Sequence, residues 1–351
     1  MNFDLNDEQQ EIKRTAHEFL ASRFKPEKVR ELAEARSYDD GLWKEISELG
    51  WPGIAISEDD GGQGLGMVEL AVLLEESGYA CAPSPLLGSA GAALVISAAG
   101  SDEQRAEWLP KLASGEATGS FGGLVNAGSS ASRPASADGQ STLFCDLPTA
   151  DVVVTFDGEG ALVAPTSEVD FEPFEAIDAT RSYGLVSDAA GERLPGDVDG
   201  GRDRLAVAIA AELTGIAQRA MEMAVEYARE RQQFGRPIGA YQGVGHRCAA
   251  MLLATEESRS LTYYASWTAD AEPESLALAA AMAGARSADA GWQVPASALQ
   301  VLGGIGFTWE HDLQFWLKRG RVAGRMLGTP RDHRERVADL SGMGAREPAA
   351  V

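Results

Sequence analysis

The sequence predicts a mainly α protein with a small β domain in the middle. Apolar residues recur at helical spacing in residues 1–119 and again from residue 198 onward. Between these parts, short β-prone runs such as Val152–Phe156 and Ala161–Val163 are separated by the turn-forming Asp157–Gly160. Because helices and strands do not alternate, the pattern excludes a doubly wound nucleotide-binding fold.

The 351 residues are more than one hydrophobic core usually supports, so we expect several domains. The changes of pattern place an N-terminal helical domain at 1–119, a β domain at 120–197 and a C-terminal four-helix bundle at 198–345. Within the β domain, residues 128–140 are rich in Ser, Ala and Gly, and we expect them to pack loosely.

Helix signals can be followed through both helical domains. Asn6 can cap a first helix, with Gln9 three residues later in the capping-box position. Further helices are expected at 42–49, 67–77, 88–99 and 102–113, then from residue 205, at 248–267 and at 274–302. The stretch Leu276–Ala285 has no charged residue, which predicts burial on more than one face and therefore an oligomer.

The charge balance limits the partners. Lys and Arg number 30 against 53 Asp and Glu, a formal net charge of −23, which argues against nucleic acid and anionic membranes. The uncharged stretch Ser77–Ser101 contains Pro83 and Pro85, so we expect a loop and a short buried helix there, not a membrane span. The sequence opens without an apolar leader segment, and a cytoplasmic location is expected.

We expect neither a metal site nor a disulfide framework. The 3 cysteines are scattered along the chain, and the 4 histidines have no metal-ligand spacing. His311–Asp312 is expected to be solvated surface.

Three segments are candidates for chemistry. Arg231–Gly235, at a helix end, offers a guanidinium, an aromatic ring and a flexible glycine that could hold a pyrophosphate; an ordinary glycine-capped helix end is the alternative. Gln300–Gly306 closes a helix, so it is either a glycine cap or a close backbone approach to a ligand. Asp203, near the start of the long helix, is either a helix cap or, if buried, a general base.

Taken in their order, these motifs resemble the acyl-CoA dehydrogenase family, flavoproteins that introduce a 2,3-double bond into acyl-CoA thioesters. The resemblance covers nearly the whole chain and includes Trp43–Gly53, Glu75–Gly78 and Asp178–Arg181. Its most specific signatures are RxxFG at 231–235 and QxxGGxG at 300–306. The resemblance implies that FAD, held mainly by a neighbouring subunit, is bound by Arg231, Phe234, Gln300, Gly303, Gly304 and Thr329.

The catalytic base departs from the family pattern. Most members carry a Glu before Gly-Thr near the C-terminus, where this chain has Leu327, which cannot accept a proton. Some members instead carry the base as a Glu before an Arg at the start of the long helix; here the pair is Asp203-Arg204, one methylene shorter. Asp203 is therefore the candidate catalytic residue.

The flavin-contacting parts of the β domain also depart from the family. The family's Thr-Glu-Pro-Gly loop corresponds to Val125–Gly128, and Leu143–Asp146 lies near the place of the Trp-Ile-Thr strand. The resemblance thus implies a shortened, β-barrel-like middle domain that has lost several parts for holding its own FAD.

Two hypotheses remain open. In the first, the chain is itself an FAD-dependent acyl-CoA dehydrogenase with Asp203 as base, and it acts on an acyl-CoA substrate and passes electrons to a transfer acceptor. In the second, it is the non-catalytic member of a heteromeric enzyme, such as the α2β2 enzymes that degrade sterol side chains in actinobacteria, and it completes the partner's FAD site. The missing base and the altered flavin loop favour the second hypothesis. Either a homo-oligomer or a hetero-oligomer with a second acyl-CoA dehydrogenase subunit is expected.

Overall fold

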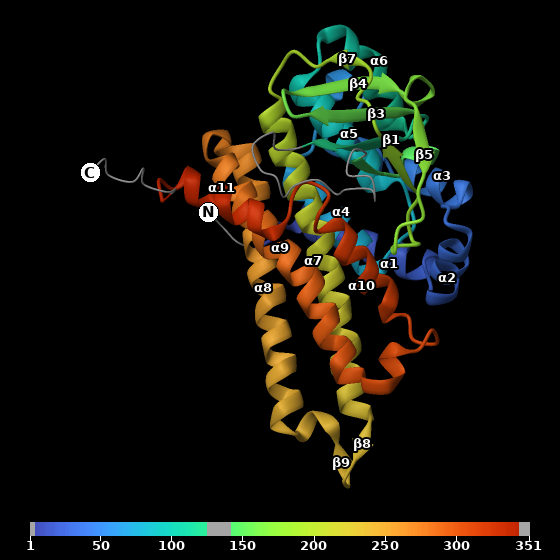
Figure 1. The fold of residues 1–351 in the computed structure, drawn as a ribbon, viewed down its shortest axis with the longest axis vertical. Coiled ribbons are helices and arrows are strands. Elements are labelled where there is room, and N and C mark those ends of the chain that lie inside the picture. The colour runs from blue at the N-terminus through green and yellow to red at the C-terminus, as the bar shows by residue number, and fades with distance from the viewer. Residues whose placement is uncertain (1–3, 125–141, 344–351) are drawn as a thin grey trace.

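The computed structural model describes residues 4–124 and 142–343 and has the predicted order of helices, sheet and helices (Figure 1). The helices of the first part are α1 (Asp7–Arg23), α2 (Pro26–Ala35), α3 (Asp40–Glu48), α4 (Met67–Ala80), α5 (Leu86–Ala99) and α6 (Asp102–Ser114). The predicted capping box opens α1: the Asn6 side chain accepts from the Gln9 amide at 2.8 Å, and the Gln9 side chain accepts from the Asn6 amide at 3.0 Å. The sequence analysis missed α2, although Pro26 stands at its first position, where proline favours a helix start.

The middle part is one seven-stranded sheet in the order β5-β6-β2-β1-β3-β4-β7. Its strands are β1 (Gly119–Leu124), β2 (Thr142–Cys145), β3 (Val152–Asp157), β4 (Ala161–Pro165), β5 (Phe171–Pro173), β6 (Tyr183–Val186) and β7 (Glu192–Arg193). β3 and β4 contain the two predicted strand runs, and β1 pairs with β3 in parallel. Gly119 lets α5 approach β1 closely, because a Cβ there would lie 2.7 Å from the Ala92 methyl carbon. The expected loose stretch at 128–140 lies outside the described residues.

The last part is a long helical bundle. It contains α7 (Val198–Glu230), α8 (Gln242–Ala271), α9 (Leu276–Leu302), α10 (Leu313–Ala323) and α11 (Pro330–Leu340), with a short hairpin of β8 (Gln232–Gln233) and β9 (Arg236–Pro237). Figure 1 shows the β8-β9 hairpin at the bundle end farthest from the sheet. No helix of the described part of the chain is both long and apolar enough to cross a membrane.

The uncharged stretch Leu276–Ala285 is buried within the chain itself. It opens α9, and α9 packs against α7, α8, α10 and α11. Its burial on several faces, as the sequence predicted, therefore needs no second subunit, so this stretch does not argue for an oligomer.

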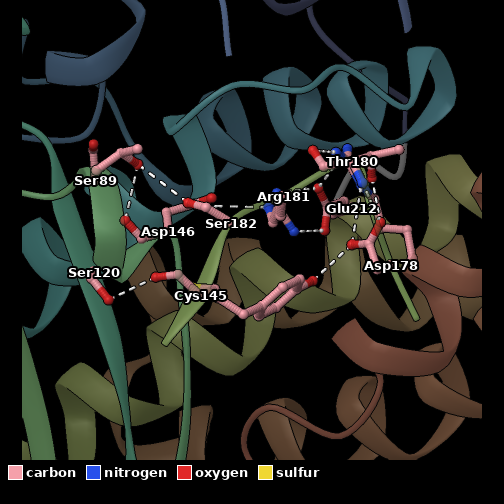
Figure 2. A network of polar contacts seen from close by, with 12 residues as sticks. Ser89, Ser120, Cys145, Asp146, Asp178, Thr180, Arg181, Ser182 and Glu212 are labelled. Carbon is pink, nitrogen blue, oxygen red and sulfur yellow. Dashed lines mark hydrogen bonds and ion pairs between the residues drawn. The ribbon is translucent and has the colours of Figure 1, made fainter. Parts of the chain in front are cut away.

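A buried cluster of charges lies where the three parts meet (Figure 2). Arg181 of the middle part donates to both carboxylate oxygens of Glu212 on α7, at 2.9 and 2.6 Å. Arg319 of α10 donates to the Thr180 hydroxyl at 2.8 Å and to the Ala82 carbonyl oxygen at 3.0 Å. These bonds join the middle part to the bundle, and through Arg319 they also join the bundle to the first part of the chain.

Candidate functional site

The predicted site residues fall into two regions at opposite ends of α7. The tip site comprises Arg231, Phe234, Gln300, Gly303 and Gly304 at the far end of the bundle, where α7 and α9 finish. The base pocket surrounds Asp203 and Leu327 near the beginning of α7. With a rise of 1.5 Å per residue, about 40 Å of helix separates Asp203 from Arg231. The structure therefore does not bring the predicted residues together in one site within a single chain.

The first half of the tip site is a tight hairpin that follows α7. Arg231 ends the helix with extended backbone, so the glycine-capped helix end considered for this segment is wrong. Phe234 and Gly235 form the turn with φ of +52° and +80°, and the Phe234 side chain is 93% exposed. A bulky residue in the left-handed region is strained, and such strain concentrates at functional sites.

Tyr241 packs against this hairpin and donates a hydrogen bond to it. Its hydroxyl donates to the Gln233 carbonyl oxygen at 3.0 Å, and its ring meets the Phe234 ring edge-on with centroids 6.3 Å apart. The Arg236 guanidinium lies 4.1 Å from the centroid of the Tyr241 ring. The exposed hairpin is therefore held in one conformation by local contacts.

The second half of the tip site is the glycine-rich end of α9. Gly303 caps α9 with φ +62°, and residues Gly303–Phe307 continue as a 3-10 turn. A Cβ added at Gly303, Gly304 or Gly235 would meet no atom within 4 Å. The backbone here is open to close approach by a ligand, so the expected glycine cap and a ligand contact are both compatible with this segment.

The tip site fits the anionic end of a dinucleotide. The Arg231 guanidinium is exposed and has no hydrogen-bond or ion-pair partner among the described residues. An unpaired guanidinium beside open glycine backbone suits a diphosphate, which it can bind bidentately. This arrangement is the observation that makes the residues compatible with FAD.

Large apolar side chains are also exposed on segments that begin or end at the tip. They are Phe234, Leu252, Leu253, Ile305, Phe307 and Trp309. Phe307, which ends the 3-10 turn, and Trp309, two residues later, are 72% and 73% exposed. Exposed apolar groups of this size mark an interaction surface.

The base pocket is closed by an ion pair. Asp203 is buried, at 3% exposure, and Arg336 of α11 donates to both of its carboxylate oxygens, to Oδ2 at 2.8 Å. The Arg202 Nε lies 3.9 Å from Asp203 Oδ1. Asp203 is not the helix cap: Asp197 caps α7 and accepts from the Gly200 amide at 2.9 Å. The capping alternative for Asp203 is therefore wrong, and its carboxylate is engaged by Arg336.

Leu327 fills the other position at which the resemblance led us to expect a base. It is buried beside Asp203, Ala206 and His333, and the space these side chains enclose is only about 20 Å³. A second gap beyond Leu327 measures about 10 Å³. A single water needs about 10 to 15 Å³ measured in this way, so the pocket has no room for a thioester.

His333 and Thr329 complete the wall of this region. The His333 imidazole packs against Gly284, and burial, followed by the Arg336 charge, lowers the pKa of His333 to about 4. The Thr329 hydroxyl donates to Asp332 Oδ2 at 2.8 Å and caps α11. Thr329, predicted to bind FAD with the other five residues, thus lies in the base pocket region and not at the tip.

The structure bears on two further expectations. Val125–Gly128, the altered flavin loop, lies outside the described residues, whereas most of Leu143–Asp146 forms β2 in the sheet. His311–Asp312 is not simple solvated surface: both are half-buried, Asp312 pairs with Arg30, and burial lowers the pKa of His311. The pair borders a cavity of about 560 Å³ between α1, α4, α7 and α10, which adjoins neither Asp203 nor Leu327.

Arg336 and His333 are the residues that the sequence analysis missed. Each lies on α11, which was not predicted as a separate helix. In the structure both side chains line the base pocket at the start of α7. The only sign of them in the sequence is a basic residue about one turn after a histidine.

Comparison with known proteins identifies the family. The family models described as acyl-CoA dehydrogenase N-terminal domain and acyl-CoA dehydrogenase C-terminal domain match residues 6–116 and 202–341. The chain belongs to the acyl-CoA dehydrogenase family. Its members are oxidoreductases that act on CH–CH bonds, and FAD-dependent dehydrogenation is general among them.

Individual relatives agree with this assignment. The chain is 32% identical to acyl-CoA dehydrogenase IpdE2 of Mycolicibacterium smegmatis over 335 residues, which cover 95% of this chain and 98% of the relative. A steroid acyl-CoA dehydrogenase solved as Tcur3481-Tcur3483 matches with a TM-score of 0.83 at 25% identity, over 96% of this chain and 98% of that one. The ChsE4-ChsE5 complex from Mycobacterium tuberculosis shares the fold with a TM-score of 0.84 at 22% identity, covering 99% and 100% of the two chains. The predicted fold class is confirmed.

Proposed function

We propose that this chain is the non-catalytic companion subunit of a heteromeric acyl-CoA dehydrogenase, and that its tip site completes the FAD site of a catalytic partner. The observation that carries the proposal is the closed base pocket. A proton acceptor must reach its proton, and here one base position is Leu327 while the Asp203 carboxylate is held by Arg336. In a catalytic subunit, FAD when bound accepts a hydride while a carboxylate takes the α-proton.

The tip site is the reason to retain an FAD role. Arg231 would bind the diphosphate, the Gly303 and Gly304 backbone would allow its close approach, and Phe234 would cover a flat ring. All of these groups face outward from the bundle end, so the FAD they serve would lie against another subunit. The exposed Phe307 and Trp309 would become buried in the same contact.

The charge of the middle domain also disfavours binding of a CoA thioester by this chain itself. Residues 120–197 contain 13 Asp and Glu against 3 Arg and no Lys. Arg181 is buried against Glu212, and Arg193 pairs with Asp157 at 2.6 Å. CoA carries several phosphate charges, which a domain with so large an excess of carboxylates repels. The acyl-CoA substrate would therefore bind in the partner.

The names of two structural neighbours are consistent with a heteromer. ChsE4-ChsE5 is a complex of two named chains, and Tcur3481-Tcur3483 pairs two names under a steroid enzyme. These names support a hetero-oligomer with a second acyl-CoA dehydrogenase subunit, and a steroid-derived acyl-CoA as a substrate class for the assembly.

A second function has one observation in its favour. Asp203 and Leu327 line the same small gap, so Asp203 would lie near a thioester if Arg336 moved away. In that case the chain would be a dehydrogenase in its own right, with Asp203 as base. It would then need its own FAD.

FAD stoichiometry separates the two functions. The chain is purified alone and together with a candidate catalytic acyl-CoA dehydrogenase subunit from the same organism, and flavin absorbance is compared with protein concentration. We expect the chain alone to carry no FAD and the complex to carry one FAD per pair of unlike chains. One FAD per chain in the protein purified alone, reducible by acyl-CoA, would contradict the proposal.

A further inference from the structure

Asp146 stands at the junction of the three domains (Figure 2). It follows β2 in the left-handed region, at φ +57°, and its amide donates to the Ser182 carbonyl oxygen at 2.8 Å. Its carboxylate is buried against α5, where a Cβ on Gly88 would lie 3.0 Å from Oδ2.

The charges around Asp146 do not balance. Two guanidiniums, of Arg181 and Arg319, face three carboxylates, of Asp146, Asp178 and Glu212, and all five residues are at most 4% exposed. If all five are ionised, the cluster holds one uncompensated negative charge. An unpaired charge in the interior costs so much free energy that such a group usually becomes neutral instead.

The hydrogen bonds indicate which carboxylate lacks a partner. Glu212 accepts from both terminal nitrogens of Arg181, and Asp178 accepts from the Tyr183 hydroxyl at 2.7 Å. Asp146 Oδ2 accepts no hydrogen bond, and its nearest cation is Arg181 Nε at 3.5 Å, which itself has no acceptor. Asp146 is thus the carboxylate of the cluster whose negative charge is least compensated.

We propose that Asp146 is a protonation switch at the domain junction: protonated, it lets Arg181 bind Glu212 fully, and ionised, it competes with Glu212 for Arg181 and loosens the middle domain from α7. This inference does not depend on the proposed function, because it concerns the contacts within one chain. Competition is expected because Arg181 Nε already points toward Asp146 Oδ2 while its other two nitrogens bind Glu212.

The neighbouring titratable groups leave Asp146 as the one that changes charge near neutral pH. Burial raises the pKa of Asp146 to about 7, against the opposing effect of Arg181 and Arg319. Burial also raises the pKa of Tyr183, of the Cys145 thiol and of Tyr38, so these groups stay neutral there. Burial opposes ionisation of Glu212, yet Arg181 and Arg319 lower its pKa, so it stays charged.

The direction of the pH effect follows from proton linkage. The folded-state pKa of Asp146 lies above its ordinary value of 3.8, so the folded chain binds this proton more tightly than the unfolded chain does. The stabilisation is complete at low pH and is lost as pH rises toward the folded-state pKa. The folding equilibrium constant should fall by about tenfold per pH unit between about pH 5 and 6.5 and level off above about pH 7.5.

The test compares urea unfolding of three forms of the full chain between about pH 5 and 8: wild type, Asp146→Asn and Asp170→Asn. Asp170 is an exposed carboxylate of the same domain with no ion pair among the described residues, so its variant is the matched control. The ratio of folding constants, Asp146→Asn over wild type, should rise by about tenfold per pH unit up to about pH 6.5, while the control ratio stays flat. A flat ratio for Asp146→Asn would overturn the proposal.

A second measurement covers the case in which Asp146→Asn does not fold. Hydrogen exchange of residues 178–186 in the wild-type chain is followed at about pH 6 and pH 8 and corrected for the intrinsic rate. We expect protection of this segment to be lower at the higher pH, with exchange in α9 unchanged. Equal protection at both pH values would refute the switch.

Discussion

The tip site and the base pocket differ in almost every physical property, although both lie along α7. At the tip, Arg231 is exposed and unpaired within the described chain, and three glycines leave room for a ligand. In the base pocket, Asp203 is buried and paired, and the gap beside Leu327 could hold about one water. The chain therefore has a surface suited to a group held outside it, while the place where the resemblance led us to expect the base is filled.

The two regions also differ in that the tip site contains a strained backbone and the base pocket contains a satisfied ion pair. Phe234 is held in a left-handed turn although its side chain is 93% exposed, and a bulky residue in this conformation costs stability. The Asp203–Arg336 pair satisfies two groups of the same chain and needs nothing from outside. Changing each region separately should thus affect different properties, assembly in one case and folding in the other.

The largest effect is expected from breaking the ion pair of the base pocket. Arg336→Ala removes both hydrogen bonds of Arg336 to the buried Asp203 carboxylate, leaving only Arg202 Nε 3.9 Å away, and should lower the free energy of unfolding by about 3 kcal/mol, measured by urea denaturation near neutral pH. If the loss arises from the unpaired charge, adding Asp203→Asn should recover part of it. A double variant no more stable than Arg336→Ala would contradict this account of the pocket.

At the tip, Arg231→Ala should weaken FAD retention in the complex by about tenfold or more, because a diphosphate loses a charge-assisted bidentate contact. FAD retention is measured by flavin absorbance after dialysis. Arg229→Ala is the control, since Arg229 is exposed two residues earlier, in the last turn of α7, and lies outside the motif. Equal retention in the two variants would remove Arg231 from the FAD site.

A smaller effect is expected at the strained turn. Phe234→Asn creates the Asn-Gly pair that such two-residue turns favour, so the chain alone should gain up to about 1 kcal/mol in unfolding free energy. The complex should meanwhile lose part of its FAD. A variant that gained no stability and kept all its FAD would show that the exposed Phe234 serves neither the turn nor the cofactor.

Features set by residues close in sequence could be predicted here, whereas features that depend on contacts between distant residues could not. The Asn6 capping box and strands β3 and β4 follow from residues close in sequence, and all appear in the structure. Arg336 lies 133 residues from Asp203, so nothing in the local sequence could pair them. The same limit explains why the uncharged stretch Leu276–Ala285 suggested an oligomer, because the helices that bury it belong to other parts of this chain.

Asp203 shows how a local rule fails in a definite way. An acid near a helix start is usually a cap, but α7 begins at Val198, seven residues before the expected start at residue 205, and Asp197 takes that role. Asp203 is then inside the helix, where its side chain reaches α11 instead of its own backbone.

The most direct test of the central claim is the rate of flavin reduction by acyl-CoA in the purified complex carrying Asp203→Asn. The variant keeps the size of the side chain and an oxygen that can accept from Arg336, so folding and assembly should survive. If the partner supplies the base, the stopped-flow rate should stay within a few-fold of wild type. A fall of several orders of magnitude, with FAD content and assembly unchanged, would make Asp203 the base and this chain a catalytic subunit.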